Sequence, residues 1–129
     1  MKNITRFWPL LCAAATLLAA TASYAGTGVD CDVSITTNIG TFSLPGAYET
    51  NGTADAPIIY QDGTDIGWAS GYGSSSEMSV GNNTTAIMFD LPPSSEYGTQ
   101  VSGEAVYVIQ NGYYATITSS EETCHSYSY

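Results

Sequence analysis

Basic side chains are missing from almost the whole chain. The 129 residues include one lysine and one arginine, and neither residue type occurs after Arg6. Proteins bind nucleic acids and anionic membranes largely by neutralising phosphates with lysine and arginine, so neither class of partner is expected. The acidity is typical of a soluble protein outside the cell, and it leaves calcium, cationic partners and neutral ligands such as glycans as candidates.

Histidine is almost absent too, which removes most common catalytic sites. The only histidine is His125, and the chain has neither a Gly-x-Ser-x-Gly turn for a serine nucleophile nor a nucleotide-binding glycine loop. A glycoside hydrolase needs only two carboxylates, and twelve acidic residues are present. We therefore expect a protein that is not an enzyme and requires no cofactor, with a carboxylate-based glycoside hydrolase as the alternative.

The first 25 residues predict a signal peptide. Residues 1–6 are short and basic, residues 7–22 are apolar or small, and Ser23-Tyr24-Ala25 places small residues where a signal peptidase cleaves. A membrane anchor is disfavoured because a proline interrupts the apolar run and no positive cluster follows it. Residues 26–129 would then form a single domain with a net charge of -12, secreted to the periplasm, the cell surface or the medium.

Cysteine is scarce in this predicted mature domain. It contains two, Cys31 and Cys124, one near each end. An even pair in an exported protein most often forms a disulfide, whereas free or metal-binding cysteines are less common in that compartment. We expect one disulfide that staples the two ends of the domain together.

The sequence lacks the apolar spacing that is typical of helices. Apolar and polar residues alternate instead, and turn dipeptides separate the alternating runs. Asn111-Gly112 separates two alternating runs, which is a strong signal for a two-residue hairpin. That register predicts one face that belongs in a core, formed by Val106, Val108, Ala115 and Ile117. It predicts a second, amphipathic face formed by Tyr107, Ile109, Tyr114 and Thr116.

Further turns and strands complete an all-β domain. Asp62-Gly63 predicts a second hairpin, and alternation continues over residues 31–36, 39–44 and 85–91. Residues 71–76 are rich in glycine and serine, which favours a flexible loop. The spacing of about eight expected strands is typical of a small antiparallel β-sandwich, Greek-key-like, or a partly closed barrel.

Aromatic residues provide the main candidate binding site. The candidates are Trp68, Tyr72, Tyr107 and Tyr114. Tyrosine and tryptophan beside small polar residues can stack on sugar rings or pack against a protein partner. The competing interpretation for Trp68 is that it fills the core of a small sandwich.

Acidic residues near the disulfide provide a candidate calcium site. Pairing the cysteines would bring four carboxylates toward one another, those of Asp30, Asp32, Glu121 and Glu122. A transition metal is the alternative if His125 contributes, and solvated terminal acids are the simplest explanation. Separately, Asn82-Asn83-Thr84-Thr85-Ala86 resembles the calcium loop of βγ-crystallins, although Ala86 stands where that loop has serine or threonine. The resemblance implies a small acidic Greek-key domain that binds Ca²⁺.

These features favour an exported, non-catalytic binding or surface-structural module. The expected partner is a glycan or an extracellular protein, or a second copy joined through the tyrosine-rich face. The last residues, 124–129, alternate aromatic and small polar side chains, so this strand could close its own sheet or add to a neighbour's. The remaining alternatives are a small inhibitor of a secreted hydrolase, presenting a loop such as 71–76, and a calcium-binding βγ-crystallin-like domain.

Overall fold

The computed structural model describes residues 26–74, 76–92, 100–101 and 104–128; the predicted signal peptide, residues 1–25, lies outside them. The described residues form twelve strands and no helix, so the prediction of an all-β fold is confirmed. Several strands are only two residues long, too short to recognise from alternation, which explains why about eight were expected. The strands are β1 (Thr27–Thr37), β2 (Gly40–Thr50), β3 (Thr53–Ala56), β4 (Tyr60–Gln61), β5 (Thr64–Asp65), β6 (Ala69–Gly73), β7 (Glu77–Gly81), β8 (Thr85–Asp90), β9 (Gln100–Val101), β10 (Ala105–Gln110), β11 (Tyr113–Tyr114) and β12 (Ile117–Ser128).

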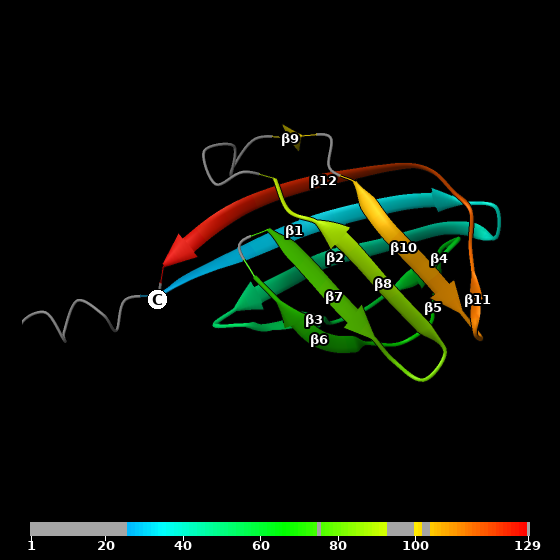
Figure 1. Cartoon of the computed structure of the whole chain (residues 1–129), viewed down its shortest axis with the longest axis horizontal. Coiled ribbons are helices and arrows are strands. Elements are labelled where there is room, and N and C mark those ends of the chain that lie inside the picture. The colour runs from blue at the N-terminus through cyan, green and yellow to red at the C-terminus, as the bar shows by residue number, and fades with distance from the viewer. Residues whose placement is uncertain (1–25, 75, 93–99, 102–103, 129) are drawn as a thin grey trace, which may run out of the picture.

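The strands form one antiparallel sheet that folds over on itself without closing into a barrel. Its order is β11-β10-β8-β7-β6-β3-β2-β1-β12-β9, with the β4–β5 hairpin attached to β2. Figure 1 shows β7, β8 and β10 side by side, crossing in front of β1 and β2. The architecture agrees with the expected small β-sandwich.

Three tight turns set the registers of neighbouring strands. Asn111-Gly112 and Asp62-Gly63 both adopt positive φ at the two central positions, as a two-residue hairpin of this type requires. Gln110 pairs with Tyr113 and Gln61 with Thr64, so both predicted hairpins are confirmed. Asn51-Gly52 makes a third turn of the same kind between β2 and β3.

The core lies between the two folded halves of the sheet. Its largest side chains alternate inward along the central strands and are fully buried, among them Phe42 and Leu44 of β2 and Ile87 and Phe89 of β8. Val108 joins this core as expected, but the placement of Val106 there is wrong. The register shifts between Ala105 and Tyr107, and this bulge leaves Val106 exposed.

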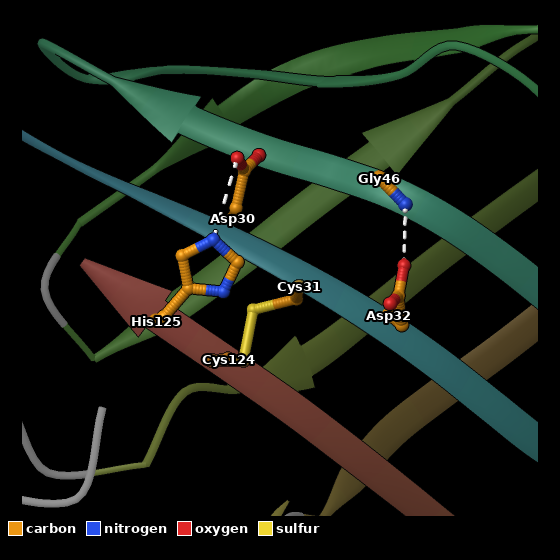
Figure 2. Close-up of a disulfide and its surroundings, with 6 residues drawn as sticks. All are labelled: Asp30, Cys31, Asp32, Gly46, Cys124 and His125. Carbon is orange, nitrogen blue, oxygen red and sulfur yellow. Dashed lines mark hydrogen bonds and ion pairs between the residues drawn. A yellow bond between two sulfur atoms is a disulfide. The ribbon is translucent and has the colours of Figure 1, made fainter. Parts of the chain in front are cut away.

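The disulfide joins the first and last long strands. Cys31 and Cys124 lie directly opposite each other in β1 and β12, with Cα atoms 4.1 Å apart, and both are buried (Figure 2). β12 pairs with β1 from Ile117 to Ser128, so the terminal strand belongs to this domain's own sheet. A disulfide is characteristic of proteins that fold in an oxidising compartment.

One predicted loop is a strand instead. Residues 71–73 belong to β6, whose partners are β3 and β7, so the expectation of a flexible loop over 71–76 is wrong for this part. The glycines there reflect crowding, because a Cβ on Gly71 would overlap the carbonyl oxygen of Ser79. In the described part of the chain, no helix is long and apolar enough to cross a membrane.

Candidate functional site

Tyr72, Tyr107 and Tyr114 lie on the outer face of the sheet formed by β6, β7, β8, β10 and β11, and Trp68 directly precedes β6. Residues that lie directly opposite each other on neighbouring strands point to the same side of a sheet. Two rows of such paired residues cross this face. The first row is Tyr72, Ser79, Met88 and Tyr107. The second row is Ser70, Gly81, Ala86, Ile109 and Tyr114. We call this surface the aromatic face.

Exposure separates the aromatic face from the core. Trp68 is 64% exposed, Tyr72 is 65% exposed and Tyr114 is 74% exposed, so Trp68 does not fill the core. Tyr107 is partly buried and meets Tyr114 edge to face, with ring centroids 6.2 Å apart. This geometry is favourable for aromatic pairs, so the two rings support each other at one side of the face.

A cavity of about 300 Å³ lies beside Trp68. It is lined by Trp68, Gly81, Asn82 and Asn83. A second, shallower hollow of about 260 Å³ continues around Trp68 toward Ile66. An indole ring beside amide side chains is a combination that can stack on an apolar surface and offer hydrogen bonds at the same time.

The side chain of Asn82 fixes the backbone around this cavity. Its Nδ2 atom donates to the carbonyl oxygens of Trp68, at 3.1 Å, and Ile66, at 3.4 Å. Its Oδ1 atom accepts the backbone N–H groups of Thr84 and Thr85, each at 3.0 Å. The β7–β8 turn and the chain at Trp68 are therefore tied together, and the exposed indole is attached to a preorganised backbone.

The middle of the aromatic face carries short side chains. Ser70, Ser79, Gly81 and Ala86 occupy most of the positions between the aromatic residues, and the partly buried Met88 and Ile109 occupy the others. The next row across β7 and β8 is acidic, because Glu77 lies directly opposite Asp90. The face thus offers rings at its sides, a low centre and negative charge along one border.

The four carboxylates proposed to bind calcium are not brought together. Asp30 lies 3.8 Å from Nε2 of His125, and Asp32 accepts the backbone N–H of Gly46 at 2.8 Å (Figure 2). Glu121 is exposed, whereas Glu122 is buried and points to the opposite side of β12. Within the described ranges, no group of three or more His, Cys, Asp or Glu side chains could hold a metal ion.

The segment that resembles a βγ-crystallin calcium loop forms the tip of the β7–β8 hairpin. Its first residue, Asn82, already uses its side-chain oxygen to accept N–H groups of the turn. The segment is therefore a structural turn at the edge of the Trp68 cavity, and Asn83 is the side chain that it exposes there.

Glu122 is the most unusual titratable group in the described part of the chain. Its side chain is 0% exposed, and neither carboxylate oxygen has a hydrogen-bond partner there. Burial, with a further contribution from the negative charge of Asp90, raises the pKa of Glu122 to about 7. The sequence predicted Glu122 as a calcium ligand or a solvated terminal acid, because alternation alone did not reveal that its face is covered.

The chain matches no protein-family model, no curated protein and no solved structure. The geometry of the aromatic face is therefore the basis for a proposed function. Two contributors to this face were not identified from the sequence: Asn82, as the clamp behind Trp68, and Asn83, as an exposed amide. Trp68 and Asn82 are fourteen residues apart in the sequence. Pairing of β6 with β7 brings them into contact, so no local pattern in the sequence indicates this hydrogen bond.

Proposed function

We propose that the protein is an exported, non-catalytic module that binds a neutral glycan on the aromatic face. The observation that carries the proposal is the exposed Trp68, attached to a clamped backbone beside a cavity that also presents Asn83. Sugar rings have an apolar face that stacks on aromatic rings and hydroxyl groups that bond to amides. The disulfide and the predicted signal peptide support export.

Charge supports an uncharged ligand. The mature domain has no lysine or arginine with which to hold phosphate, sulfate or carboxylate groups, and Glu77 and Asp90 border the face. An anionic ligand would meet repulsion without a compensating partner. A neutral glycan loses nothing from this arrangement, because its recognition uses ring stacking and hydrogen bonds.

Replacing Trp68 with alanine is expected to weaken binding of the recognised glycan at least tenfold, because the stacking platform is lost. Trp68 is the only tryptophan after residue 25, so fluorescence of the mature protein reports ligand contact directly. The measurement is fluorescence titration of the oxidised wild type with a panel of cello-, laminari-, malto- and chito-oligosaccharides. Calorimetry then compares the wild type with the Trp68→Ala variant.

Tyr113→Ala is the matched control for this test. Tyr113 is 79% exposed and adjoins Tyr114, but successive residues of a strand point to opposite faces, so its ring is not on the aromatic face. The control is expected to bind as the wild type does. Failure of all neutral glycans on the panel to bind, or equal binding by Trp68→Ala, would contradict the proposal.

Filling the cavity beside Trp68 is expected to block the ligand without harming the fold. A Cβ at Gly81 would lie 3.4 Å from the Thr85 carbonyl oxygen and 3.5 Å from the Ala86 Cβ, which are ordinary contacts. Gly81→Thr should therefore change the free energy of unfolding by less than about 1 kcal/mol, since threonine suits a strand better than glycine. Affinity for the glycan should fall at least tenfold. Paired calorimetric titrations and thermal melts measure both effects; unchanged affinity in a folded variant would remove Gly81 from the site.

A further inference from the structure

We infer that the ligand is an extended oligosaccharide that crosses the strands, from a first contact at Trp68, next to β6, to a second at Tyr107 and Tyr114. This inference rests on the proposed function, because it assigns the length and direction of the glycan bound at the same face. A single sugar at Trp68 would use only one side of that face. The distribution of the aromatic residues across the sheet is what requires a longer ligand.

The aromatic residues at the two ends of this path lie on different strands of one sheet. Trp68 directly precedes β6 and Tyr72 belongs to it. Tyr107 is on β10 and Tyr114 is on β11. β7 and β8 lie between β6 and β10, which makes three strand intervals, or about 14 Å along the sheet at about 4.8 Å each. Several linked sugar rings can span this separation, and one ring cannot.

The row between the two contacts is low enough for a chain to lie across it. Gly81 and Ala86 are directly paired in the centre, and Ser70 and Ser79 are the neighbouring outward residues of β6 and β7. The hydroxyl groups of the two serines can bond to sugar hydroxyls without raising the surface. Met88 is partly buried, so it contributes an apolar floor beside Tyr107.

The second contact has its own support. Tyr114 is held against Tyr107 by the edge-to-face contact, and its backbone pairs with Ile109 in the tight β10–β11 hairpin. An exposed ring attached to a short hairpin loses little conformational freedom when a ligand stacks on it. The acidic pair Glu77 and Asp90 borders the path, so chains built from acidic sugars should be rejected.

A length series tests this inference on the intact oxidised domain. The probe is the oligosaccharide type that binds in the panel, titrated calorimetrically from monosaccharide to hexasaccharide. We expect the dissociation constant to fall stepwise with length and then level off once both contacts are filled. Tyr114→Ser is expected to weaken the longest oligosaccharide about tenfold and to leave the monosaccharide titration that Trp68 fluorescence reports unchanged.

The control and the opposing results separate the two proposals. Tyr113→Ser changes the adjacent tyrosine on the opposite face and should bind every length as the wild type does. Affinity that stops rising at one or two sugars, or an equal loss at all lengths in Tyr114→Ser, would overturn the extended ligand while leaving glycan binding at Trp68 in place. No binding at any length would overturn both.

Discussion

Reducing the Cys31–Cys124 disulfide is expected to lower the free energy of unfolding by about 4 to 5 kcal/mol. The bond joins residues separated by 93 positions, so it restricts nearly the whole unfolded domain. In the chain-entropy account, a loop of this length gives one of the larger gains available from a single crosslink. Because a domain of this size is usually stable by only about 5 to 15 kcal/mol, the loss is a large part of the total.

Urea unfolding of residues 26–129, with and without reductant, measures this effect. The double variant Cys31→Ala, Cys124→Ala separates the crosslink from packing, since both cysteines are buried and their removal also leaves a small void. We expect the free energy of unfolding of the variant to equal that of the reduced wild type or to be slightly lower. Adding reductant should not change it. If the free energy of unfolding of the reduced protein is within about 1 kcal/mol of that of the oxidised protein, the pairing of β1 with β12 does not depend on the disulfide.

The buried carboxyl of Glu122 is expected to make the protein less stable as the pH rises toward neutrality. Its pKa is raised from 4.5 to about 7 in the folded protein, first by burial and second by Asp90. The folded state therefore binds a proton that the unfolded state has released, and stability falls with pH between these two values. The full contribution is present below pH 4.5, and about 3 kcal/mol is lost once the pH is above 7.

Glu122→Gln is the direct test, because an amide keeps the shape and removes the titration. The variant should unfold with nearly the same free energy as the wild type at about pH 4 and be about 3 kcal/mol more stable at about pH 8. Glu121→Gln, on the exposed side of the same strand, removes an equal charge. The difference between its free energy of unfolding and that of the wild type should not rise comparably from about pH 4 to about pH 8. A constant difference between Glu122→Gln and the wild type across this range would mean that Glu122 does not titrate there.

The fold could be predicted where local chemistry decides it. Asn111-Gly112 and Asp62-Gly63 adopt positive φ in any hairpin of this length, so their turns followed from two residues each. Asn51-Gly52 is the same kind of dipeptide, adopts the same positive φ values and joins β2 to β3. Val106 could not be placed, because the bulge beside it depends on how β8 and β10 pair.

The site could be predicted only in its composition. The types of Trp68, Tyr72, Tyr107 and Tyr114 suggested a surface, but their shared face depends on the order β6-β7-β8-β10-β11, which joins strands far apart in the chain. The calcium hypothesis rested on the closeness of four carboxylates to the disulfide in the sequence. In the structure, side chains alternate between the two faces of β12, so Glu122 points away from Asp30. Sheet order and burial are both long-range properties, which explains why neither could be obtained from local patterns.

The most direct test of the aromatic face is an amide chemical-shift map of oxidised residues 26–129 with a bound neutral oligosaccharide. We predict the largest changes at the Trp68 indole N–H and at the backbone amides of Gly81, Ala86 and Tyr114. The outer face of β1 and β12, around Asp30 and His125, should be unaffected. Changes confined to β1 and β12, or scattered without relation to β6, β7, β8 and β10, would contradict the proposed binding site.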